Sequence, residues 1–130
     1  MTRAYFDSSA LVKLVREEVE SQALIDYIEQ DELEASTSAI AHVEVVRTLR
    51  RCGCDDAEAL RGFYLVQLDA EIQQEAANLP SRSLRALDAI HIATALATGG
   101  RNLQFVTYDD RQAEAARAAG LQVVQPGRNA

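Results

Sequence analysis

The chain has little cysteine and no long apolar stretch. Cys52 and Cys54 form a lone C-G-C, too little for a four-ligand zinc site or a disulfide framework, so we expect reduced thiols. No apolar run reaches the roughly 18 residues that a membrane-spanning helix needs. The first residues also lack the basic, apolar and small-residue pattern of a secretory signal. We therefore expect a cytoplasmic protein without a membrane segment.

The chain is also short of positive charge. Its formal net charge is −7, which argues against a surface that is basic overall and binds nucleic acid without discrimination. Of its 13 basic residues only Lys13 is a lysine, and the others are arginines, which can bind phosphate through two parallel hydrogen bonds. Any nucleic-acid contact must therefore come from a local group of arginines.

A glycine-rich turn after the first strand-like segment is missing, which argues against dinucleotide binding. What the chain has instead is an alternation of strand-like and helix-like segments over 130 residues, the usual size of one compact domain. Strands separated by helices pair in parallel, and each helix can cover one face of their sheet. We predict a single domain, 1–130, of the α/β class: a three-layer α/β/α sandwich with a central parallel sheet of four to five strands.

Apolar periodicity, helix caps and terminators define the individual segments. Strands are expected near residues 3–6, 34–37, 103–108 and 121–124. Helices are expected after a cap at Ser8 or Ser9, and then at about 21–30, 38–52, 55–66, 69–78, 84–97 and 110–119. The tail, 126–130, is expected to be unstructured.

Two aspartates follow predicted strands. Asp7 and Asp109 stand at carboxyl ends, where parallel sheets bind their ligands. Each could instead simply cap the helix that follows it, because an aspartate accepts hydrogen bonds from the free amides of a first turn. Either aspartate taken alone leaves both interpretations open.

Two further acids lie within apolar helical segments. A buried carboxylate needs a partner, and Asp88 has His91 three residues on, while Glu44 has Arg47 at the same spacing. Local pairs are therefore one explanation of both acids. His91 is either a ligand beside Asp88 or a hydrogen-bonded core residue, and His42 is expected to be structural or on the surface.

All four acids could converge on one rim of the sheet, which the separate local explanations do not account for. At about 4 Å, two carboxylates repel by roughly 4 kcal/mol at an effective dielectric of 20, so such a cluster needs cations. Oxygen ligands favour Mg²⁺ or Mn²⁺, and these ions hold a phosphodiester and activate water. The joint pattern therefore predicts phosphodiester hydrolysis.

The chain also resembles the PIN-domain proteins of the VapC toxin type. The resembling motifs follow the family's order and span essentially the whole chain: YFDSSALVKL, SAIAHVEVVRTLRR, LRALDAIHIATAL, FVTYDDR and GLQVVQP. The resemblance implies a Mg²⁺- or Mn²⁺-dependent endoribonuclease, the toxin of a type II toxin–antitoxin pair, which inhibits growth or translation. It also implies a VapB-type antitoxin as partner, RNA as substrate and a homodimer.

The resemblance assigns roles to individual residues. The implied catalytic and metal-binding acids are Asp7, Glu44, Asp88 and Asp109. Supporting hydroxyls are implied at Ser8 or Ser9 and at Thr107. Asp110 directly follows Asp109, and the family pattern points to the first of the two. Arginines near the acid-bearing segments are interpreted as RNA contacts or as a solvated helix face: Arg47, Arg50, Arg51, Arg82 and Arg85.

Two other functions share parts of this pattern. A phosphatase could use Asp7 as its covalent nucleophile, but enzymes of the haloacid-dehalogenase type need a second acid two residues later, where this chain has Ser9. A PIN-like module that binds RNA or a protein without cleaving RNA is the remaining alternative. The presence of all four acids argues against it.

Overall fold

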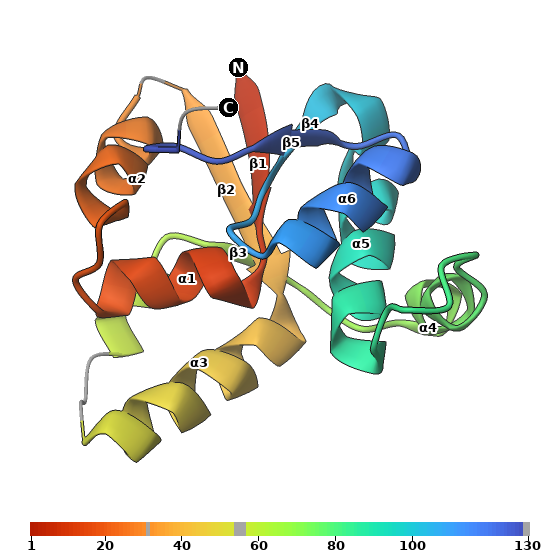
Figure 1. The fold of residues 1–130 in the computed structure, drawn as a ribbon, viewed down its shortest axis with the longest axis horizontal. Helices are drawn as coiled ribbons and strands as arrows, with labels where there is room; N and C mark the ends of the chain where they lie inside the picture. Colours follow the sequence, from red (N-terminus) through yellow and green to blue (C-terminus); the bar gives the residue numbers. More distant parts are fainter. Residues whose placement is uncertain (31, 54–56, 129–130) are drawn as a thin grey trace.

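The computed structural model describes residues 1–30, 32–53 and 57–128; Cys54 lies outside these ranges. A single five-stranded sheet crosses this part of the chain, in the order β3-β2-β1-β4-β5, and every adjacent pair is parallel (Figure 1). The strands are β1 Thr2–Phe6, β2 Leu33–Ser38, β3 Tyr64–Val66, β4 Leu103–Val106 and β5 Gln122–Val124. This confirms the predicted parallel sheet.

Helices connect the strands and cover the sheet on both faces (Figure 1). They are α1 Ser8–Val15, α2 Ser21–Ile28, α3 Ala39–Cys52, α4 Ala70–Ala77, α5 Ala86–Thr98 and α6 Asp110–Ala118. Two short 3-10 turns, Ala57–Leu60 and Gly100–Asn102, complete the order. Within the described ranges, no helix combines the length and apolarity needed to cross a membrane.

The central strand supplies side chains to two cores, because successive residues of a strand point to opposite faces. Ala4 and Phe6 pack in one buried cluster with residues of α1, α2 and α3. Tyr5 belongs to the other cluster, with residues of α5 and α6, and its ring stacks on that of Phe105 at 5.6 Å. The sheet therefore lies between two helical layers, as the three-layer prediction requires.

Four helices of the described part begin shortly after a strand ends, on the same rim of the sheet. Asp7 joins β1 to α1, Ser38 joins β2 to α3, Asp69 joins the end of β3 to α4, and Asp109 joins the end of β4 to α6. The side chain of each accepts a hydrogen bond from a backbone amide in the helix that it caps. The helix cap expected at Ser8 or Ser9 is therefore wrong, since the cap is Asp7.

The helix predicted over 55–66 is wrong in the part that the structure describes. Residues 57–60 form a 3-10 turn, and Tyr64–Val66 form strand β3, which pairs with β2 at Ser36–Ser38. Gly62, with φ of +93°, has a backbone conformation that a helix cannot contain. The β-forming residues after it then continue as an edge strand.

The tail was predicted to be unstructured, but its described residues are held in place. The Tyr108 hydroxyl donates to the carbonyl of Pro126 at 2.7 Å. The guanidinium of Arg128 bonds to Glu20 and to Asp110, each at 3.2 Å. These partners lie far away in the sequence, which is why local composition did not predict the contacts.

Candidate functional site

Asp7 lies buried at the end of the central strand, with only 3% of its surface exposed. Its Oδ1 accepts hydrogen bonds from the Ala10 amide at 3.1 Å and from the Ser9 hydroxyl at 2.6 Å. Its Oδ2 accepts from the Thr107 hydroxyl at 2.5 Å. Asp7 is thus a helix cap, as one interpretation predicted, and it also binds two of the hydroxyls that were predicted to support it.

The Asp7 carboxylate is costly to ionise where it lies. Burial raises its pKa, while the charge of His91 and the hydrogen bonds from Ser9, Thr107 and Ala10 oppose this increase. Burial dominates, so the ionised form is under-stabilised by the protein groups around it. A cation at this rim would therefore bind most favourably to the ionised state.

The Ser9 and Thr107 hydroxyls also tie the ends of β1 and β4 together. Ser9 Oγ accepts from the Tyr108 amide at 2.9 Å, and Thr107 Oγ1 accepts from the Asp109 amide at 3.2 Å. Each hydroxyl therefore accepts a backbone amide from the β4 end and donates to Asp7. This arrangement fixes the carboxylate relative to both strand ends.

Glu44 is held by contacts from two other elements. Its Oε2 accepts from the Ser8 hydroxyl at 3.1 Å, and its Oε1 lies 3.0 Å from His91 Nε2. The Nδ1 atom of His91 lies 2.7 Å from the Tyr5 hydroxyl. Glu44 thus bonds to Ser8 and His91, so the local pair with Arg47, one of the two explanations left open by the sequence, is wrong.

These contacts determine where the imidazole carries its hydrogen. An ionised Glu44 can only accept, so His91 Nε2 donates to it; Nδ1 accepts from the Tyr5 hydroxyl when the ring is neutral and donates to the Tyr5 oxygen when the ring carries its positive charge. His91 is 1% exposed, as expected of a hydrogen-bonded core residue. The alternative in which His91 bonds to Asp88 is wrong, since its two ring nitrogens contact Glu44 and Tyr5.

Asp88 lies in the first turn of α5 and is half-buried. Burial raises its pKa, the charges of Asp109 and Glu44 raise it further, and those of His91 and Arg111 oppose them. The carboxylates of α3, α5 and the α6 cap therefore lie close enough to influence one another. The structure thus places Glu44, Asp88 and Asp109 near one another.

The side chains of Asp109 and its neighbour Asp110 bond to different parts of the protein. Asp109 Oδ1 accepts from the amides of Arg111 at 2.9 Å and Gln112 at 3.2 Å, so this aspartate caps α6. The Asp110 side chain is 90% exposed and bonds to Arg128 in the tail. Of the two, Asp109 is the one whose charge acts on Asp88.

The acids share a rim, but they do not form a closed cage. In residues 1–30, 32–53 and 57–128, no three side chains of histidine, cysteine, aspartate or glutamate converge as direct ligands of one ion. Mg²⁺ does not require such a cage, because it keeps several of its waters and takes only one or two carboxylates. The carboxyls of Asp7 and Asp88 have raised pKa values because nearby positive charge does not compensate for their burial. Carboxylate oxygens of this kind are compatible with a hydrated hard cation.

The arginines predicted to contact RNA are all exposed: Arg47, Arg50, Arg51, Arg82 and Arg85. His42 is exposed as well, in agreement with a surface role. Two residues near the acids were not selected from the sequence: Arg111, whose charge acts on Asp88, and Tyr5, which looked like a core residue of an apolar strand. The Tyr5 contact could not be inferred, since His91 lies 86 positions away.

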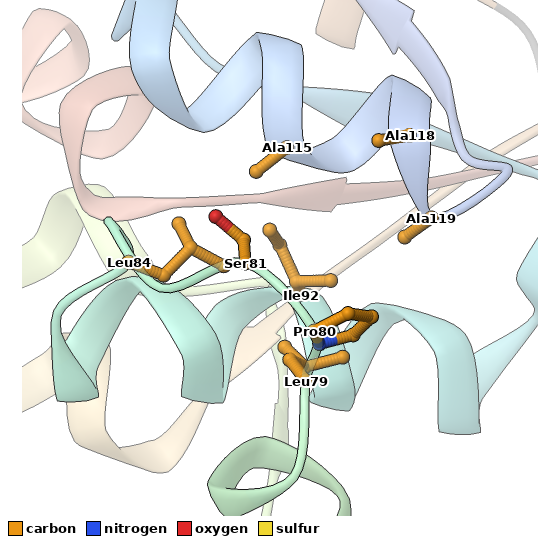
Figure 2. Close-up of a pocket in the computed structure, with 8 residues that line it drawn as sticks. All are labelled: Leu79, Pro80, Ser81, Leu84, Ile92, Ala115, Ala118 and Ala119. Carbon is orange, nitrogen blue, oxygen red and sulfur yellow. The ribbon is translucent and has the colours of Figure 1, made fainter.

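A separate apolar cavity of about 300 Å³ lies between α6 and the segment that leads into α5. Figure 2 shows Leu79, Pro80 and Leu84 of that segment on one side and the alanines at the end of α6 and its C-cap on the other: Ala115, Ala118 and Ala119. The four predicted acids do not line this cavity. It is therefore distinct from the acidic rim.

Comparison with known proteins places this geometry in a family. The PIN domain family model matches residues 4–118. Ribonuclease VapC35 of Mycobacterium tuberculosis is 43% identical over 95% of this chain and 97% of its own length. Among solved structures, M. tuberculosis VapC20, described as a Sarcin-Ricin loop cleaving toxin, superposes with a TM-score of 0.73 at 20% identity, covering 95% of this chain and 99% of that one. A toxin–antitoxin complex from Klebsiella pneumoniae gives 0.71 at 22% identity, with 95% and 97% covered.

The coupling around Asp88 predicts an unusual effect of Asp88→Asn on stability. Because the folded state raises the pKa of Asp88, the proton binds more tightly to the folded than to the unfolded chain. Stability from this group is therefore present at low pH and is lost as pH rises through the raised pKa. In chelator at pH 7.5, thermal melts should show Asp88→Asn to be as stable as the wild type or more so, and the difference should vanish near pH 3.

Glu71→Gln is the matched control, since Glu71 is an exposed acid in the first turn of α4. The melting temperature of Glu71→Gln measures only the effect of removing an acid from a helix N-terminus, where negative charge is favourable. If Asp88 instead formed a buried ion pair, Asp88→Asn would cost roughly 3 kcal/mol or more in chelator. That outcome would contradict the coupling described above.

Proposed function

Because this chain belongs to the PIN-domain family, among its VapC ribonucleases, we propose that it is the toxin of a toxin–antitoxin pair and cleaves RNA internally with Mg²⁺ or Mn²⁺. The observation that carries the proposal is the Asp7 carboxylate, buried at the end of β1 and costly to ionise, with three further acids along the same rim. Such a rim is suited to a cation and, through it, to a phosphodiester.

The ion would be held by Asp7, Glu44, Asp88 and Asp109, whose carboxylate oxygens are the ligand type that Mg²⁺ and Mn²⁺ prefer. A bound Mg²⁺ or Mn²⁺ supplies Lewis acidity, which favours ionisation of an attacking water and neutralises charge on the phosphate. Within the protein, Ser9 and Thr107 hold both oxygens of Asp7 in place.

Glu44 is oriented by a different set of groups. The Tyr5 hydroxyl and His91 form a buried chain that ends on Oε1, while Ser8 bonds to Oε2. With both oxygens engaged, Glu44 presents its remaining acceptor positions to the solvent side of the rim, where its side chain is 22% exposed. Glu44 would therefore contribute to holding a cation through its exposed acceptor positions.

The overall negative charge is compatible with an RNA substrate if the basic contacts are local. Arg47 lies one turn beyond Glu44 in α3, while Arg82 and Arg85 precede Asp88. All three side chains are exposed, and we propose them as contacts to RNA phosphates. Binding through such contacts weakens as salt concentration rises.

The first test of the proposed function is Asp7→Asn in an RNA cleavage assay. Purified protein is incubated with total cellular RNA in Mg²⁺, in Mn²⁺ and in chelator, and new RNA ends are mapped. The wild type should cleave only with the ion, and Asp7→Asn should lose at least about 100-fold in rate, since an anionic ligand and its hydrogen-bonded geometry are removed.

Asp69→Asn provides a matched control, because Asp69 caps α4 through the same kind of side-chain bond, at 2.8 Å to the Ile72 amide. It should cleave like the wild type. Equal cleavage by the wild type and Asp7→Asn would point to a contaminating nuclease. Specific RNA binding without any cleavage would support the non-cleaving module instead.

The neighbouring aspartates provide a second prediction for the same assay. Asp109→Asn should lose most activity, because Asp109 is coupled to Asp88, whereas Asp110→Asn should keep at least about half, because Asp110 faces Arg128 in the tail. Both proteins should remain folded, since Asn can still cap α6 at position 109 and the Asp110 side chain is exposed. If Asp110→Asn were the inactive variant and Asp109→Asn the active one, the functional acid would be Asp110 and not Asp109.

We also propose a VapB-type antitoxin as partner, supported by the toxin–antitoxin complex among the structural neighbours. Expression of the chain alone should arrest growth, and co-expression with the product of an adjacent small gene should restore it through a stable complex. The molar mass of the purified proteins tests the homodimer, which remains a prediction. Harmless overexpression of the folded chain would contradict the toxin assignment and favour the non-cleaving module.

A further inference from the structure

Gln112 is a polar side chain in an unusual position. It lies in the first turn of α6, and only 1% of its surface is exposed. Its Nε2 donates to the backbone carbonyl of Asp88 at 3.3 Å. Its Oε1 is buried and has no hydrogen-bond partner among the described residues.

The residue touches both acids whose charges are coupled across α5 and α6. Its backbone amide donates to the carboxylate of Asp109, and its side chain holds the main chain at Asp88. The first contact is part of the cap of α6, and the second joins the start of α6 to the start of α5. Two like charges favour separation, and the Gln112 side chain opposes it by joining the two first turns.

Stability alone does not explain why an amide occupies this position. A buried acceptor without a partner costs free energy that an apolar side chain of the same size avoids. The carbonyl of Asp88 also has its own acceptor role within α5, so it does not depend on Gln112 to be satisfied. An unbranched apolar residue such as methionine would fill the same space without the orphaned oxygen.

We propose that Gln112 is a positioning residue of the acidic site: it sets the spacing between Asp88 and Asp109 and thereby the affinity of the site for a divalent cation. This inference rests on the proposed function, because it concerns the same ion. Gln112 acts through the two acids and does not itself contact the RNA. Its effect is therefore expected in the binding of the ion.

The experiment compares the wild type with Gln112→Met and Gln112→Leu by thermal melting, without RNA, in chelator and over a series of Mn²⁺ concentrations. The matched control is Gln73→Met, since Gln73 is an exposed glutamine of α4 whose Nε2 also bonds to a backbone carbonyl, that of Leu68. RNA cleavage is then measured at limiting and at saturating Mn²⁺.

In chelator, Gln112→Met should melt at or above the wild-type temperature, since the orphaned acceptor is gone. The Mn²⁺ concentration that gives half of the stabilisation should rise roughly 10- to 100-fold, the usual effect of losing a group that orients metal ligands. Cleavage should fall at limiting Mn²⁺ and recover largely at saturating Mn²⁺. Gln73→Met should match the wild type in every measurement.

Three results would overturn the inference. An unchanged half-saturating Mn²⁺ concentration in a folded Gln112→Met or Gln112→Leu would separate Gln112 from the ion. Loss of the fold, or a clearly lower melting temperature in chelator for both variants, would show a purely structural role. A wild type that does not respond to Mn²⁺ at all would instead remove the ion from the proposed function, and this inference with it.

Discussion

A carboxylate buried at the end of the central strand must be hydrogen-bonded and, when ionised, matched by positive charge. The ends of β1 and β4 are organised around that requirement at Asp7, through the Ser9 and Thr107 hydroxyls and the first-turn amide of Ala10. Burial still outweighs these bonds and raises the pKa of the carboxyl. The fold thus holds an acid in a fixed position and leaves part of its charge unbalanced, which is the condition under which a divalent cation adds most.

The other acids reach the same rim by different routes. Glu44 is oriented by the buried chain from Tyr5 through His91, so a residue in the sheet core determines the position of a carboxylate on α3. Asp88 lies in the first turn of α5, and Asp109 is the cap of α6; both positions are helix N-termini, which favour negative charge. Parallel topology brings these helix starts to one edge, and the site follows from the connectivity of the sheet.

Much of this arrangement could be predicted from the sequence, because periodicity and caps are local. The alternation of segments predicted the parallel sheet, and the position of Asp7 after an apolar strand predicted its place on the rim. Strand β3 was missed because one glycine, Gly62, ends the helical pattern there. The partner of His91 was also missed: Glu44 lies 47 positions away, and only the placement of α3 and α5 around the end of the sheet decides which acid the ring meets.

The most direct test of the account is the titration of the Asp7 carboxyl, followed by NMR on protein labelled with ¹³C at aspartate carboxyls, in chelator and with Mg²⁺. The Asp7→Asn spectrum identifies the signal. We predict that the pKa of Asp7 in chelator lies above the ordinary range of an aspartate, and that Mg²⁺ lowers it, because the cation favours the ionised form. An Asp7 carboxyl that titrates in the ordinary range in chelator, with no response to Mg²⁺, would contradict the account.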